Sequence, residues 1–189
     1  MNEQEPLPFG TALRAVIRCA LTTAVLLARG RIRLPRQHVG ERLRFANGTS
    51  AWVYRETVLY RSAPMDPCVL VVEFRLRAVR GRGHAFFRRV SLLNTPLFVG
   101  FPGFVSKFWM ADDEQGVYRG LYEWDGPVRA EAYARALWRV LALVSARGSI
   151  HYRVLPGLRR DEFLGEPAGP GQAAAAEVPE EWWRPVAVA

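Results

Sequence analysis

Four stretches of this sequence are predicted to be β-strands, and their polar positions hold the side chains that could do chemistry. In the stretch 68–79 the even-numbered residues are apolar, whereas Glu73 and Arg75 are odd-numbered. Successive side chains of a strand point to opposite faces of a sheet, so polar residues of neighbouring strands can share one face. The residues assigned to that face are Glu73, Arg75, Lys107, Trp109, Arg119, Glu123, His151 and Arg153.

Two interpretations of this polar face are open. In one, acidic and basic side chains form cross-strand ion pairs that line a barrel between two subunits. In the other, the face is a substrate pocket in which Lys107 or an arginine stabilises a substrate enolate, and His151 or Glu73 moves a proton. Lysine and arginine suit that electrostatic role because they stay charged beside groups of opposite sign.

The opposite face of the same strands is aromatic. Its side chains are expected to pack against two helices, through Phe86, Phe87, Leu93 and Tyr133. Such a layer is either ordinary core or a binding site for a flat apolar molecule. Each tyrosine hydroxyl in it needs a hydrogen-bond partner, a water or a ligand. The strand residues of this layer are Phe108, Tyr118, Tyr122, Trp124 and Tyr152.

A hairpin at the centre of the chain positions both sets of side chains. Aromatic and β-branched residues fill 104–111 and 117–124, and the polar turn 112–116 ends in a glycine. A strand and a helix precede the hairpin, and a helix and a strand follow it, which is the ferredoxin-like order βαββαβ of an α+β fold. The flanking elements are a strand at 68–79, a helix from 84 to about 99, a helix at 127–147 and a strand at 149–155.

Periodic apolar residues define the two helices of this unit. Pro96 should kink or break the first helix, whereas Pro127 and Gly148 are suited to begin and end the second. The expected buried stripes are Phe86, Phe87, Val90, Leu93 and Leu97 on the first helix, and Tyr133, Leu137, Val140, Leu141 and Val144 on the second.

The N-terminal part is predicted to form a helix and a further hairpin. The helix, 11–29, has an apolar stripe, and Arg14 and Arg18 interrupt what would otherwise be a membrane-spanning run. It is interpreted either as a helix packed on its own domain or on a dimer mate, or as a peripheral membrane helix assisted by the arginines that follow it. In the hairpin, 41–61, Asn47-Gly48 supplies the tight turn.

The chain divides into three parts at changes of composition. Residues 1–61 form the helix and hairpin extension, and a linker at 62–67 leads into the ferredoxin-like domain at 68–164. From 165 to 189 the chain is rich in Pro, Gly and Ala, so this tail is expected to be flexible. The tryptophan pair at 182–183 is expected to dock on the domain or on a partner.

Charge and composition restrict the partners of the protein. The chain has 189 residues, half of them apolar, which suffices for one core. Residues 1–100 hold 16 arginines against 6 acids, a net charge of +10, whereas residues 101–189 hold 10 bases against 12 acids. The bases form no long run and no nucleic-acid motif, so nucleic acid is not an expected partner. Cys19 and Cys68 give no disulfide framework, which favours a reducing, cytoplasmic location.

The sequence contains no motif for a metal or nucleotide cofactor. Its three histidines, His38, His84 and His151, lack the spacing of metal ligands. The glycines at 81–83 lack the spacing of a nucleotide fingerprint. We therefore expect chemistry that uses no bound cofactor.

A resemblance to a known family covers about half of the chain. It is carried by Pro-Leu-Phe at 96–98, Phe-Pro-Gly-Phe-Val-Ser-Lys at 101–107 and Gly-Leu-Tyr-Glu-Trp at 120–124. On these residues the domain at 68–164 resembles the dimeric α/β-barrel superfamily, and most of all its small monooxygenase-like proteins. The resemblance implies a homodimer in which two sheets close a barrel with helices outside. It also implies a planar polycyclic substrate between sheet and helices, with Tyr, Trp, Asn and His around it.

Together these features predict a cofactor-independent enzyme of specialised metabolism that acts on a hydrophobic polycyclic or polyketide-like small molecule. A monooxygenase-like enzyme would let the substrate's own enolate or phenolate react with dioxygen. A cyclase or isomerase would hold one conformer and relocate a proton. A non-catalytic ligand-binding or membrane-associated accessory protein is the third interpretation. The predicted catalytic residues are Tyr118, Tyr122, Lys107, Arg119 and His151, and the predicted substrate-binding residues are Glu73, Arg75, His84, Phe87, Asn94, Phe108, Trp109 and Trp124.

Overall fold

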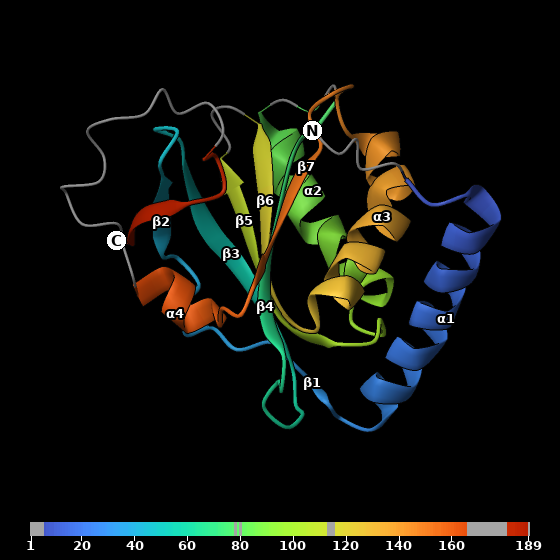
Figure 1. Cartoon of the computed structure of the whole chain (residues 1–189). Coiled ribbons are helices and arrows are strands. Elements are labelled where there is room, and N and C mark those ends of the chain that lie inside the picture. Colours follow the sequence, from blue (N-terminus) through green and yellow to red (C-terminus); the bar gives the residue numbers. More distant parts are fainter. Residues whose placement is uncertain (1–5, 78, 80, 113–115, 166–180, 189) are drawn as a thin grey trace.

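The computed structural model describes residues 6–77, 79, 81–112, 116–165 and 181–188 (Figure 1). Most of the predicted turn at 112–116 and the tail segment 166–180 lie outside the described residues. The elements are α1 (Phe9–Ala28), β1 (Ile32–Arg33), β2 (Arg42–Phe45), β3 (Ser50–Leu59), β4 (Pro67–Arg75), α2 (Arg82–Val90), the 3-10 helix η1 (Ser91–Leu97), β5 (Phe104–Asp112), β6 (Val117–Asp125), α3 (Pro127–Val144), β7 (His151–Pro156), α4 (Arg160–Gly165) and β8 (Pro185–Val188).

The predicted ferredoxin-like unit is confirmed by the strand order. β4, α2, β5, β6, α3 and β7 follow one another along the chain, and the strands lie in the sheet as β7-β4-β6-β5 with antiparallel pairing throughout. Gly126, with a φ of 105°, turns the chain from β6, and Pro127 then begins α3. A proline suits the first helical turn because that position makes no intrahelical N–H bond.

The N-terminal hairpin continues this sheet instead of forming a separate unit. β2 and β3 are joined through Asn47-Gly48, as predicted, and Gly48 has a φ of 78°. β3 pairs with the edge strand β5, so the sheet extends to the order β7-β4-β6-β5-β3-β2-β8. The hairpin thereby covers the edge that β5 would otherwise expose.

The C-terminal residues close the far edge of the sheet. β8 pairs antiparallel with β2, so the prediction of a flexible tail is wrong for these last described residues. Trp183 packs against Phe163 of α4, with ring centroids 6.4 Å apart. The docking expected for the tryptophan pair is therefore confirmed, and it occurs within the chain.

Each face of the sheet is buried over much of its area against the chain's own elements. On the side of α2, η1 and α3, here called the helix side, Cys68 and Leu70 pack with Tyr133, as the alternation in β4 predicts (Figure 1). On the other side, here called the α4 side, Val69 and Val71 belong to a core cluster with Phe163. That second face was expected to be wet or to meet another subunit. The homodimer stays a prediction.

The roof over the helix side differs from the predicted helix at 84–99. α2 ends at Val90, and the chain continues as η1, which contains Pro96. Phe86 is 70% exposed and Leu93 is 74% exposed, so both were wrongly placed in the buried stripe. His84, Phe87 and Ser91 point inward instead. The two polar side chains can be buried because His84 is hydrogen-bonded to Tyr118 and Ser91 is hydrogen-bonded to Tyr54.

α1 packs on α3 and η1 and makes a further layer outside them (Figure 1). Its inner residues Ala12, Cys19 and Thr23 are buried. Gly100, just after η1, lies directly against this face, since a Cβ there would collide with the carbonyl oxygen of Cys19 and lie 2.8 Å from Thr23 Oγ1. The close approach of α1 to the domain therefore requires a glycine at this position.

Gly100→Ala is expected to lower the free energy of unfolding by about 1–3 kcal/mol, because the added methyl group pushes against the α1 backbone. Gly10→Ala in the first turns of α1 is the matched control, since a Cβ there meets open space. Urea unfolding followed by circular dichroism measures both variants. Equal stability of Gly100→Ala and Gly10→Ala would show that α1 is not packed as described.

Candidate active site

A cavity of about 270 Å³ lies between the sheet and its helix-side roof. Strands β3, β4, β5 and β6 form its floor, and α2, η1 and α3 form its roof. Most of its wall is aromatic or aliphatic, which suits a hydrophobic ligand. Its lining includes Tyr54, Val72, Phe74, Phe87, Ser91, Asn94, Phe98, Lys107, Trp109, Tyr118, Tyr122, Tyr133, Leu137 and Leu141.

A bulge in β5 places Lys107 in this cavity. The pairing of β5 with β6 shifts register between Phe104 and Ser106, so Val105 is the extra residue. An extra residue reverses the alternation of every later side chain in the strand. Lys107 and Trp109 consequently face the helix side, and Phe108 faces the α4 side. The sequence-based placement of these three residues was wrong for this reason.

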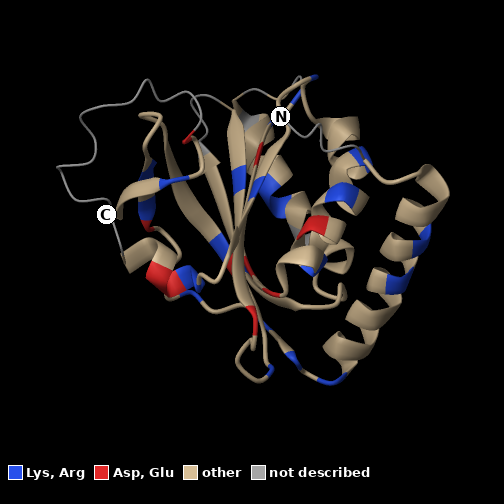
Figure 2. Ribbon diagram, viewed as in Figure 1, with Lys and Arg blue, Asp and Glu red and all other residues tan. Residues whose placement is uncertain are grey.

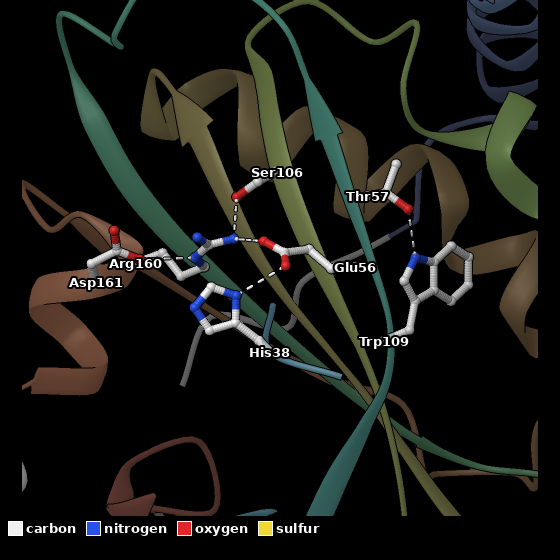
Figure 3. A network of polar contacts seen from close by, with 7 residues as sticks. All are labelled: His38, Glu56, Thr57, Ser106, Trp109, Arg160 and Asp161. Atoms are coloured by element: carbon white, nitrogen blue, oxygen red, sulfur yellow. Dashed lines mark hydrogen bonds and ion pairs between the residues drawn. The ribbon is translucent and has the colours of Figure 1, made fainter. Parts of the chain in front are cut away.

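The contacts of neighbouring residues confirm the reversed alternation. On the α4 side, Ser106 accepts a hydrogen bond from Arg160 at 3.2 Å, and Glu56 binds both Arg160 and His38 at 2.9 Å. Trp109 points to the opposite side, where its Nε1 donates to Thr57 (Figure 3). The α4-side network fastens α4 to β3 and β5.

The amine of Lys107 is enclosed by aromatic rings. Its Nζ lies 3.3 Å from the ring centroid of Trp109 and 4.6 Å from those of Phe98 and Tyr122. The side chain is buried, and within the described residues Nζ has no hydrogen bond or ion pair. Burial lowers the pKa of Lys107 well below its ordinary value, and the charge of Arg55 lowers it further. Both effects shift the equilibrium toward the neutral amine, which is a base and a nucleophile.

Arg55 supplies a cation next to the same tryptophan. The pairing of β3 with β5 shifts register between Val53 and Arg55, and Tyr54 and Arg55 both reach Ser91 on the helix side. The Arg55 guanidinium carbon lies 3.7 Å from the Trp109 ring centroid. Burial lowers the pKa of Arg55 to about 10, so the group remains charged at neutral pH. Arg55 does not itself line the cavity, but its charge beside Trp109 stabilises negative charge that develops on a ligand during a reaction.

The tyrosines of the cavity are held as hydrogen-bonded pairs. The Tyr122 and Tyr133 hydroxyls lie 3.0 Å apart, and burial raises the pKa of both. The Tyr118 hydroxyl lies 3.1 Å from Nδ1 of His84, which packs behind it in α2. Protonated phenols can donate to a ligand oxygen, so the cavity offers hydroxyl groups in two places.

Four of the five predicted catalytic residues are among those that line the cavity: Lys107, Tyr118, Arg119 and Tyr122. The guanidinium of Arg119 lies on the α4 side, in an ion pair with Glu73 and 2.7 Å from Thr49 Oγ1. His151 is exposed on that side, with its ring 6.0 Å from that of Trp182. The catalytic role assigned to Arg119 and His151 is therefore not supported by their position, and for Glu73 and Arg119 the ion-pair interpretation applies.

The predicted substrate-binding residues divide in the same way. Phe87, Asn94 and Trp109 line the cavity, and His84 supports Tyr118 from behind. Trp124 is core, with its ring 4.9 Å from that of Tyr133 and 5.6 Å from that of Phe104. The remaining three, Glu73, Arg75 and Phe108, belong to the α4 side or to its exposed end.

Tyr54, Arg55 and Phe98 were missed by the sequence analysis. Tyr54 and Arg55 belong to the N-terminal hairpin. Their place near the cavity could not be predicted, because the sequence does not show that this hairpin pairs with β5. Phe98 follows η1 and packs on Trp109 at a centroid distance of 5.2 Å. A signal for Phe98 was present, since it lies in the Pro-Leu-Phe element on which the family resemblance rests.

Known proteins share little sequence with this chain: no model of a protein family and no curated protein matches it. An uncharacterized ferredoxin-fold protein of Listeria monocytogenes, described as related to antibiotic biosynthesis monooxygenases, matches over 59% of this chain and 66% of its own, with 14% identity and a TM-score of 0.44. A monooxygenase-like protein of Listeria innocua matches over 59% and 67%, with 15% identity and a TM-score of 0.42. An anthrone oxidase-like protein matches over 58% and 54%, with 16% identity and a TM-score of 0.38. The fold of this chain is established by its own strand order.

The burial of Lys107 predicts a pH-dependent cost in stability. At pH values between the lowered pKa of Lys107 in the folded state and the ordinary value of 10.5, the lysine binds a proton in the unfolded chain but not in the folded chain. Stability therefore rises with pH across this window, by up to about 1.4 kcal/mol per pH unit. Lys107→Met keeps the apolar stem and removes the amine. It is expected to be more stable than the wild type at pH 7, with a difference that shrinks toward pH 10 in urea titrations. A pH-independent difference would show that Lys107 is charged in the folded state.

Proposed function

We propose that the protein is a small-molecule enzyme of the monooxygenase-like kind, which binds a flat hydrophobic compound in the cavity and uses no bound cofactor. The observation that carries the proposal is the buried amine of Lys107 in an aromatic wall, with no described acidic partner. A perturbed basic group in an apolar pocket with a few polar groups is typical of an active site. The sequence resemblance supplies the reaction class.

Lys107 acts as the general base in this proposal. Its neutral amine takes a proton from a C–H or O–H group that is acidified by a neighbouring carbonyl or aromatic ring. The resulting ammonium group lies beside the carbanion, enolate or phenolate that it has created, and Arg55 adds a second positive charge nearby. The tyrosine hydroxyls hold the oxygen atom of the substrate through hydrogen bonds.

Dioxygen then accepts electrons from the activated carbon of the substrate. For a methylene group between two rings, one molecule of substrate and one of dioxygen give one ketone and one water. Both C–H bonds of the methylene group and the O–O bond break; one oxygen atom enters the new carbonyl group, and the other leaves as water with both protons. The enzyme supplies a base, a cation and an apolar site, and no electrons of its own. A volume of about 270 Å³ is near the lower end of ligand pockets, which suits a compact ligand.

Oxygen consumption with anthrone, a neutral three-ring compound with an acidic methylene group, tests the reaction. The wild type is expected to consume oxygen, and Lys107→Met is expected to be slower by about 10²–10⁴-fold, the usual contribution of a general base. Leu93→Ser is the control, because Leu93 lies in the roof but is 74% exposed. It should keep the wild-type rate.

Two outcomes would contradict this reaction. If Lys107→Met is as active as the wild type, Lys107 is not the base. If polyketide-like substrates are converted at the same rate under argon, the protein is a cyclase or isomerase that uses the proton transfer alone.

The homodimer and the cytoplasmic location are also proposals. The dimer is supported by the family resemblance, and light scattering of the purified protein measures it. Cys19 and Cys68 are both free and buried, in keeping with a reducing compartment such as the cytoplasm.

A second role, contact with an anionic membrane surface, is supported by the outer face of α1. By length and composition α1 is the one helix of the described segments that could cross a membrane, yet its inner face packs on α3 and η1. The outer face carries a ridge of exposed apolar side chains, among them Phe9, which is 68% exposed, and Leu21, which is 66% exposed. The remaining large residues of this apolar ridge are Leu13, Ile17, Val25 and Leu27.

Arginine side chains lie next to the apolar ridge. Arg14 and Arg18 lie beside it on α1, and arginines at 29, 31, 33 and 36 follow its end (Figure 2). An exposed apolar stripe with flanking arginines is the pattern of a helix that lies in a membrane interface and prefers anionic lipid.

Vesicle sedimentation tests this contact. The wild type is expected to sediment with vesicles that contain phosphatidylserine and to bind less to vesicles of phosphatidylcholine alone. Ile17→Glu with Leu21→Glu should abolish sedimentation, whereas Thr11→Glu with Thr22→Glu, exposed positions away from the ridge, should reduce it only partly. If the ridge variant instead turns a dimer into a monomer and vesicle binding is absent throughout, a second copy covers the ridge.

A further inference from the structure

We propose that Lys107 also forms a covalent imine with hydrophobic aldehydes and ketones that enter the cavity. This inference rests on the pocket of the proposed function and narrows its ligands to neutral carbonyl compounds. It assigns to Lys107 a nucleophilic role, in which the amine itself is joined to the ligand. The arrangement of groups around Nζ carries it.

The surroundings of Nζ are those of a reactive amine. Imine-forming lysines are activated by an apolar pocket or by a neighbouring cation, because both disfavour the ammonium form. Lys107 has both, since Trp109, Phe98 and Tyr122 enclose Nζ and Arg55 lies against the same tryptophan. No acid among the described residues contacts Nζ to stabilise its charged form.

The cavity also favours the product of the reaction. The lone pair of Nζ attacks the carbonyl carbon, and the carbonyl oxygen takes up a proton. The resulting carbinolamine loses water, so that one C=N bond replaces one C=O bond, and re-entry of water reverses the sequence. The paired hydroxyls of Tyr122 and Tyr133 line the same space and can pass the proton. An apolar wall retains little water, which disfavours hydrolysis.

The charges around the cavity define which carbonyl compounds fit. A ligand carboxylate would pair with Lys107 and return it to the unreactive ammonium form. Neutral compounds leave the amine free to react, and the aromatic lining of Phe87, Phe98 and Trp109 favours a flat ring system. The expected ligand is therefore an uncharged aromatic aldehyde or ketone.

The composition of the chain makes the test direct, because Lys107 is its only lysine. The full-length protein is incubated at pH 7 with 2-naphthaldehyde and sodium cyanoborohydride, and the reduced adduct is located by peptide mass spectrometry. Labelling of Lys107 is expected to be several-fold faster than that of the N-terminal amine, because the cavity holds the aldehyde beside an amine whose charged form burial disfavours. 2-Naphthalenemethanol, which has the same ring but no carbonyl group, should give no adduct.

Two variants control for folding and for access. Lys107→Met keeps the apolar stem but has no amine to form an imine, so the adduct should disappear. Leu141→Trp keeps Lys107 and fills the cavity from α3, so labelling should slow by about tenfold or more if the reaction takes place inside. Labelling that is as fast in urea as in buffer, or unchanged in Leu141→Trp, would overturn the proposal.

The covalent reaction and the proposed enzyme activity can fail separately. If oxygen consumption depends on Lys107 but no adduct forms, the imine proposal is wrong and the role of Lys107 as general base is retained. If an adduct forms at Lys107 but the protein converts no substrate, the proposed enzyme activity is wrong and the protein is a carbonyl-binding protein.

Discussion

The desolvation of a single amine is the constraint on which the site depends. A lysine is seldom placed among aromatic rings, because burial of its charged form is costly unless an acid compensates it. Lys107 lies 3.3 Å from the centroid of Trp109 and has no described acidic partner, so burial is compatible with the neutral amine. The same physical effect that weakens the fold at neutral pH makes the group a base and a nucleophile.

The sheet is arranged so that this amine can be enclosed. The bulge at Val105 rotates Lys107 and Trp109 to the helix side. The hairpin strand β3 then brings Tyr54 to the same cavity wall and Arg55 to the ring of Trp109. The roof also contributes to the site. Where α2 changes into the 3-10 helix η1, Ser91 and Asn94 face the cavity. Three segments far apart in the sequence therefore have to meet before the site exists.

The residues on the α4 side of the sheet have a structural role. Glu56 of β3 and Arg160 of α4 pair at 2.9 Å (Figure 3). Glu73 pairs with Arg119. The first pair joins α4 to β3, and the second joins β6 to β4 within the ferredoxin-like unit. With α4 and the docked tryptophans in place, a face that the family resemblance assigns to a subunit interface is largely occupied by the chain itself.

The sequence by itself determined the order of the elements of the ferredoxin-like unit, because alternation, helical periodicity and turn glycines are local properties. It also determined the faces of β4 and β6, where strict alternation separates Val69 from Leu70 and Arg119 from Tyr118. Only the tertiary structure decided the face of β5, since a single inserted residue at Val105 leaves no distinctive pattern yet reverses Lys107, Phe108 and Trp109. It also decided which edge the hairpin joins and where β8 pairs, because these contacts link residues distant in the chain and are selected by packing.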